Sequence, residues 1–123
     1  MEKTIQIDGK DVKFRATAAI TRLYRIKFGR DIMQDMKDVD AAMKKAEDGA
    51  AIPPKLLQVF EDVSYLMAKH ASPEDVPATP EEWLDGFEAF SIYVVFPQLM
   101  ELWKANNMTL GTAKKKVGPP TGK

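Results

Sequence analysis

The sequence contains no cysteine and a single histidine, His70, among 123 residues. The lack of thiols excludes disulfides and thiolate metal sites, and one imidazole alone does not make a structural zinc site. His70 falls on the apolar side of a predicted helix, near its end, where we interpret it as a capping or edge-of-core residue. We therefore predict no catalytic residue, no metal site and no cofactor.

Long apolar runs and phosphate-binding glycine motifs are also missing. No stretch approaches the roughly 18 apolar residues that a membrane-spanning helix needs, and the charged, alternating first ten residues are unlike a secretion signal. The seven glycines are too scattered for GxxxxGK[ST] or GxGxxG. These absences predict an intracellular protein that neither spans membranes nor binds nucleotides.

The net charge is zero, but the charges are segregated along the chain. Residues 1–30 carry eight basic and three acidic side chains, residues 31–90 five and fourteen, and residues 91–123 five and one. Such segregation is typical of solvated helix faces, although it can also favour self-association or docking of a partner. Because the acidic middle would repel a duplex, nucleic-acid binding is not expected. A small DNA- or RNA-binding regulator, using the basic residues 18–28 and Lys114–Lys116, is the alternative function.

Near the N-terminus, apolar and polar residues alternate with a period of two in two short runs, which predicts a β-hairpin whose inner face carries Ile5, Ile7, Val12 and Phe14. We predict the register in which Ile7 faces Val12 and Ile5 faces Phe14 around a four-residue loop. The rejected alternative, a tight turn at Asp8-Gly9, would place Ile7 opposite Lys10.

Helical periodicity dominates the rest of the chain. It predicts helices over residues 18–28, 32–48, 56–70 and 92–107, with a shorter one starting at residue 80. Their termini carry the expected signals, which are N-caps at Thr17, Asp31 and Thr79 and a glycine C-cap at Gly29. The predicted fold is mainly α: one domain over residues 1–105, with an N-terminal β-hairpin followed by a bundle of four to five short helices. Residues 106–123 are predicted to form a flexible basic tail, disordered when free.

The helix over residues 56–70 has a wide apolar face, and we expect the other helices to cover it. Its opposite side, with Glu61, Asp62 and Tyr65, is predicted to face solvent. The helix before it carries methionines on its apolar stripe, which either fill gaps in the core or form an adaptable binding surface.

The last predicted helix is apolar on more than one side, and Pro97 inside it predicts either a kink or a break. Such a helix is either wedged inside the domain or covered by another chain. We hypothesise a partner-binding surface made of Tyr93, Val94, Phe96, Met100 and Trp103. If these residues lie on the surface, Asp at Val94 or Met100 should change the unfolding free energy by no more than about 1 kcal/mol.

Four blocks of the sequence, at residues 14–36, 59–71, 80–87 and 90–103, begin with FRATAAITRLYRIKFGRDIMQDM and end with FSIYVVFPQLMELW. In their order and spacing, they resemble the tail assembly chaperones of long-tailed phages and prophages of Gram-positive bacteria. The matching residues are packing and capping patterns, so the resemblance carries over no catalytic residue.

The resemblance implies a non-enzymatic chaperone that binds the tape-measure protein, keeps it soluble and recruits tail-tube subunits to it. Such a protein acts in the cytoplasm of the bacterial host and is absent from the mature virion, and it can form homo-oligomers along its client. Many members also have a longer form made by programmed frameshift. The codons of Lys114–Lys116 are a candidate slippery site for such a shift.

Overall fold

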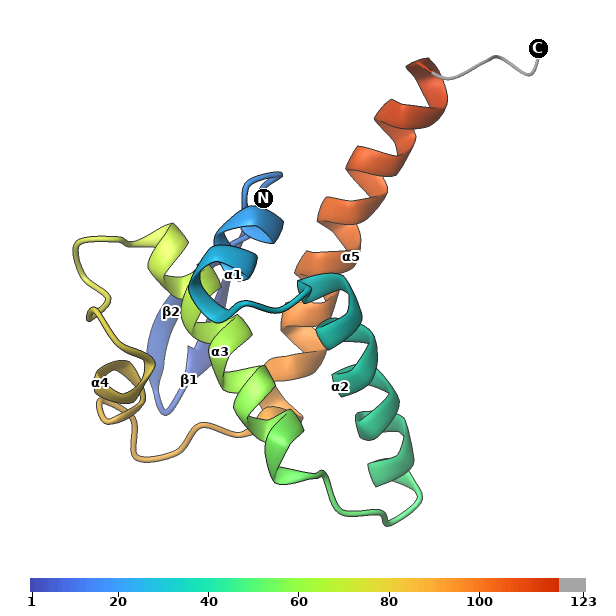
Figure 1. The fold of residues 1–123 in the computed structure, drawn as a ribbon. Helices are drawn as coiled ribbons and strands as arrows, with labels where there is room; N and C mark the ends of the chain where they lie inside the picture. The colour runs from blue at the N-terminus through green and yellow to red at the C-terminus, as the bar shows by residue number, and fades with distance from the viewer. Residues whose placement is uncertain (118–123) are drawn as a thin grey trace.

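The computed structural model describes the backbone of residues 1–117 and the side chains of residues 1–107. In this part of the chain, a two-stranded hairpin precedes five helices (Figure 1). The elements are β1 (Glu2–Ile7), β2 (Lys10–Arg15), α1 (Ile20–Phe28), α2 (Ile32–Glu47), α3 (Pro54–Ala71), α4 (Pro80–Leu84) and α5 (Ile92–Val117). This architecture confirms the predicted mainly-α fold with an N-terminal hairpin.

The hairpin register differs from the predicted one. Ile5 lies opposite Val12 and Ile7 opposite Lys10, so the strands are joined by the tight turn at Asp8-Gly9. Both turn residues have positive φ, 56° and 76°, as type I′ turns require. A type I′ turn matches the right-handed twist of the strands, and this preference decides against the predicted four-residue loop.

The wrong register still gave the right buried face. The observed and predicted pairings differ by two residues, and side chains in a strand alternate with a period of two. Ile5, Ile7 and Phe14 therefore remain on one side, and all three are at most 3% exposed. The hairpin rests this face on α3 and α5, since β2 contacts α3 and β1 contacts α5.

Helix α3 is the centre of the molecule and contacts every other helix as well as β2 (Figure 1). Its predicted apolar face, which includes Phe60 and Met67, is buried. The prediction that Asp62 and Tyr65 face solvent is wrong, because elements pack on α3 from several sides. The Tyr65 hydroxyl donates to the Pro77 carbonyl oxygen at 2.6 Å, which satisfies it in that position.

Three of the four predicted helix-terminus signals are confirmed. Gly29 is left-handed at φ 70° and closes α1, and the Asp31 carboxylate accepts from the Met33 amide at 2.9 Å. The Thr79 hydroxyl accepts from the Glu82 amide at 3.2 Å at the start of α4. These local motifs need only a few neighbouring residues, which explains why the sequence predicts them well.

Thr17 does not cap α1, which begins only at Ile20. The Thr17 carbonyl accepts from the Ile20 amide in a preceding turn. Its hydroxyl accepts from the Ala19 amide at 3.3 Å in this turn. It also shares a 2.9 Å hydrogen bond with Nε2 of His70, which lies 53 residues away.

Pro97 lies inside an uninterrupted α5, so the predicted break at this residue is wrong. The side-chain amide of Gln98 donates to the Val94 carbonyl oxygen at 3.0 Å, which adds a bond near the proline. The helix continues past residue 105, and Asn106 is buried on it. The side chains of residues 108–123, most of the predicted tail, lie outside the described residues, so its predicted disorder stays a prediction.

Candidate functional site

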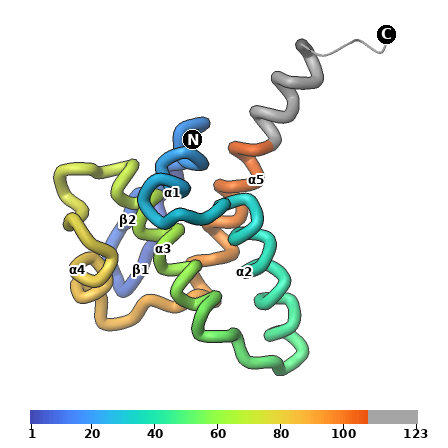
Figure 2. The backbone as a smooth tube through the Cα atoms, viewed as in Figure 1, coloured from blue at the N-terminus to red at the C-terminus, as the bar shows by residue number. Residues whose placement is uncertain are grey.

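Helices α2 and α5 lie next to each other on one side of α3 (Figures 1 and 2). Side chains of both helices line a groove between them. Two adjoining hollows of about 360 and 280 Å³ make up this α2–α5 groove. Both hollows are lined by Asp40, Met100 and Lys104, so they form one feature. The two helices are antiparallel: the start of α2 faces Trp103 and Asn107, whereas its end faces Phe96 and Pro97.

Methionine is the main apolar residue of this groove. Four of the seven methionines in the sequence line it, namely Met33, Met36, Met43 and Met100. Met33 is 44% exposed at the edge, while Met36 and Met100 are buried beneath the opening. Methionine side chains are unbranched and flexible, so such a lining can fit partners of different shape. The predicted core role is confirmed for Met36, and the predicted adaptable binding surface stays a prediction.

Charged residues border the groove along both helices. Lys37 and Asp40 stand on α2, while Glu101 and Lys104 stand on α5. Asp40 pairs with Lys44 at 3.3 Å, and Glu101 pairs with Lys3 of the hairpin. The groove therefore combines an apolar floor with polar edges, which is typical of sites that receive an amphipathic helix.

The five residues predicted to bind a partner do not form one exposed surface. Tyr93 and Val94 are 60% and 53% exposed on the first turn of α5, but Phe96, Met100 and Trp103 are at most 9% exposed. The last three residues face inward and line the walls of the α2–α5 groove instead. Because Met100 is buried, the expectation that Met100→Asp leaves stability almost unchanged is corrected. That expectation stands for Val94.

Pro97 joins the two parts of the predicted surface. It lies one turn after Tyr93 and Val94, is exposed, and lines the smaller of the two hollows beside Phe96. An apolar path therefore leads from the exposed first turn of α5 into the groove. The sequence pointed separately to the α5 residues and to the α2 methionines as binding surfaces, but not to their facing each other across one groove.

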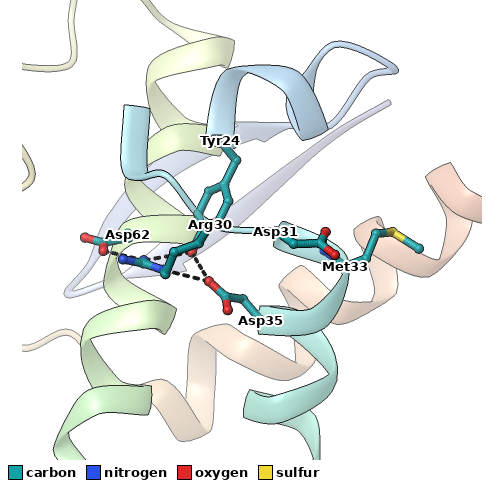
Figure 3. A network of polar contacts seen from close by, with 6 residues as sticks. All are labelled: Tyr24, Arg30, Asp31, Met33, Asp35 and Asp62. Carbon is teal, nitrogen blue, oxygen red and sulfur yellow. Dashed lines mark hydrogen bonds and ion pairs between the residues drawn. The ribbon is translucent and has the colours of Figure 1, made fainter. Parts of the chain in front are cut away.

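A second polar site is the joint at which α1, α2 and α3 meet, centred on Arg30 (Figure 3). The Arg30 guanidinium donates to Oδ2 of Asp35 and to Oδ2 of Asp62, each at 2.8 Å, and to the Tyr24 hydroxyl at 2.9 Å. Tyr24 in turn donates to Asp35 Oδ2 at 2.6 Å. Asp31 and Met33 point away from this cluster.

The electrostatics of the joint fit a structural role. Burial and the bond to Asp35 raise the pKa of Tyr24, so the phenol stays protonated and remains a donor. Burial also raises the pKa of Asp62, and this exceeds the opposing effect of Arg30. No buried side-chain nitrogen or oxygen among the described residues lacks a hydrogen-bond partner. The cluster is thus closed, with no polar atom directed at a ligand.

Asp62, which the sequence predicts to be solvated, is buried at this joint, and Arg30 is not among the residues that the sequence predicts to be functional. The position of Arg30 in the sequence could have identified it, because Arg30 is the only residue between the C-cap Gly29 and the N-cap Asp31. A cation held in so short a connection has few directions in which to point.

His70, the single histidine, lies at the edge of the core, as interpreted from the sequence. It bonds Thr17, and burial together with Arg15 and the chain's amino terminus lowers its pKa. Within the described part of the chain, no group of three or more His, Asp or Glu side chains is placed to hold a metal ion. Over the same residues, no helix combines the length and apolarity needed to cross a bilayer.

Comparisons of this chain with protein-family models, with curated proteins and with solved structures find no match.

Proposed function

We propose that this protein is a non-enzymatic tail assembly chaperone of a long-tailed phage or prophage. Its client would be the tape-measure protein, which it keeps soluble while tail-tube subunits are recruited. It would act in the host cytoplasm and leave before the virion is complete. The proposal starts from the resemblance of the four sequence blocks, and the α2–α5 groove is the structural observation that supports it.

A tape-measure protein is a long, largely helical chain that exposes apolar stripes before assembly. The α2–α5 groove suits such a client in shape, because Met33 and Glu47 mark its ends on α2. At a rise of 1.5 Å per residue these positions are about 21 Å apart, or about four turns of a bound helix. Repeating short grooves along a long client would raise overall affinity through multivalency.

The test is coexpression with the tape-measure product, scored by the soluble fraction of that product and by co-purification. Met33→Asp places a charge at the exposed edge of the groove and should abolish co-purification. Its matched control is Ile26→Asp, since Ile26 is 69% exposed on α1 and does not line the groove. Both changes are at the surface, so each should alter the unfolding free energy by less than about 1 kcal/mol.

The outcome is decisive in either direction. A tape-measure product that stays insoluble beside the unmodified protein would refute the proposed client. Equal loss of binding in Met33→Asp and Ile26→Asp would show that the groove is not the binding site. Val94→Asp additionally tests whether the exposed first turn of α5 belongs to the same surface.

The alternative function, a small DNA- or RNA-binding regulator, draws on one observation. Arg22, Arg25 and Lys27 of α1 are exposed. Binding through these cations would weaken steeply as salt is added and would be lost in Arg22→Glu/Arg25→Glu. The exposed Leu23 and Ile26 between them are unusual for a phosphate-binding face, so the chaperone is preferred.

A further inference from the structure

Two lysines that form no ion pair with the described side chains of residues 1–107 stand on opposite walls at one end of the α2–α5 groove. Lys37 belongs to α2 and Lys104 to α5, and both line the larger hollow. No ion pair forms at either lysine within the described residues, whereas the carboxylates of Asp40 and Glu101 are already paired with Lys44 and Lys3. The charge left uncompensated at this end of the groove is therefore positive on both sides.

We propose that the groove selects an amphipathic helix whose apolar stripe is bordered on both sides by carboxylates. This inference rests on the proposed function, because it specifies the chemistry of the helical client. The stripe would lie against Met33, Met36 and Trp103, and the flanking carboxylates would meet Lys37 on one side and Lys104 on the other. Charges placed this way mainly determine which partner binds and how fast, while apolar contact supplies the affinity.

A second copy of this chain is a poorer occupant. The exposed apolar pair on its α1, Leu23 and Ile26, is bordered by Arg22 and Arg25. Docking that face into the groove would bring these arginines toward Lys37 and Lys104. Like charges brought together on binding are unfavourable, so the groove disfavours this self-association and favours an acidic partner.

The experiment uses two synthetic helical peptides of roughly 21 residues, long enough to hold a helix in solution. Both carry the same Leu/Ala stripe, bordered by Glu in one peptide and by Lys in the other. Binding to the full chain is measured by fluorescence anisotropy at low and at high salt. The Glu-bordered peptide should bind about tenfold more tightly at low salt, and the difference should shrink as salt screens the charges.

Charge reversal at the two lysines is the specific test. Lys37→Glu/Lys104→Glu should invert the preference, so that the Lys-bordered peptide binds more tightly. The matched control is Lys13→Glu/Lys55→Glu, which changes net charge equally at two exposed residues outside the groove. The control should keep the original preference, and circular dichroism checks that both variants remain folded.

Equal binding of the two peptides, or binding of neither, would overturn this inference. If the tape-measure product still co-purifies in that case, the proposed function stands and only the acidic border is wrong. If co-purification also fails, the proposed function falls with it. Sedimentation of the protein alone tests whether a second copy of this chain occupies the groove. An oligomer that dissociates in Lys37→Glu/Lys104→Glu would identify the second copy as the occupant and overturn the inference.

Discussion

The two sides of α3 are packed with different chemistry. On the side of the hairpin and α4, Trp83 makes edge-to-face contacts with Phe14, Tyr65, Phe87 and Phe90 at centroid distances of 5.2 to 6.3 Å. On the side of α2 and α5, methionines line a hollow of about 360 Å³. We call these the aromatic side and the methionine side.

The difference shows how one small domain can combine rigidity with a binding site. Aromatic rings have few rotatable bonds and preferred mutual angles, so the aromatic side fixes the hairpin and α4 on α3. Thioether chains bend easily and fill irregular space, so the methionine side can close around a partner. Substitutions on each side of α3 test this contrast.

Trp83→Ala should have the largest effect, a loss of about 4 kcal/mol in the unfolding free energy. Trp83 is 6% exposed and touches four other aromatic rings, so its removal leaves a cavity that the stiff neighbours cannot fill. Urea unfolding followed by circular dichroism measures the loss. A cost no larger than that of Met36→Ala on the methionine side would end the contrast.

Arg30→Met should cost about 3 kcal/mol, because it leaves the carboxylate of Asp62 buried without its cation. Adding Asp62→Asn should recover part of that loss, since a neutral amide is less costly to bury. Urea unfolding of both variants measures the two values. If the double variant is no more stable than Arg30→Met, the bond to Asp62 is not the reason for the cost.

Met36→Leu should cost less than about 1.5 kcal/mol, because leucine conserves volume and an open hollow lies next to the side chain. The same substitution at Met67, which is buried on α3 away from the groove, is the matched control. The expected order is a smaller cost at Met36 than at Met67. The reverse order would mean that the methionine side is the more tightly packed of the two.

The smallest effect concerns pH and His70. Its pKa is lowered by burial, Arg15 and the chain's amino terminus, so the unfolded chain takes up a proton at a higher pH than the folded one. The stability that depends on neutral His70 is therefore complete above the ordinary pKa of histidine. It is lost as the pH falls below that pKa and through the lowered pKa of the folded protein. Because His70 is partly exposed, we expect a change of no more than about 0.5 kcal/mol.

The measurement is the urea midpoint at pH 7.5 and at pH 5, compared between the unmodified protein and His70→Gln. Glutamine keeps a polar partner for Thr17 and does not titrate in this range. The unmodified protein should lose slightly more stability on acidification than the variant. Identical pH dependence in the two proteins would show that His70 does not contribute to the loss of stability on acidification.

Local patterns predicted the parts of this fold that depend on near neighbours. The caps at Gly29, Asp31 and Thr79 each involve residues within four positions, and the apolar face of α3 follows from helical spacing alone. The prediction of the hairpin register was wrong because the two possible registers bury the same face, and only the geometry of the turn distinguishes them.

The features that the sequence did not predict depend on residues far apart in the chain. His70, one of the two partners of the Thr17 hydroxyl, lies 53 residues away, and Asp62 is 32 residues from Arg30. The two walls of the groove were predicted separately, since the α5 residues were proposed to bind a partner and the α2 methionines were offered as an adaptable surface. That these residues face each other became visible only in the structure, because periodicity shows which face of a helix is apolar but not what lies across from it.

The three-residue connection between α1 and α2, in which Arg30 stands between the caps Gly29 and Asp31, leaves no spare length at the Arg30 joint. Each residue inserted there could displace the guanidinium by up to about 3.5 Å, far more than a hydrogen bond tolerates. The length of this connection thus fixes the positions of α1 and α2 relative to α3. Natural variants of this protein should accordingly gain or lose residues in the long connections before α3 and before α4, and keep the spacing from Gly29 to Asp31 unchanged.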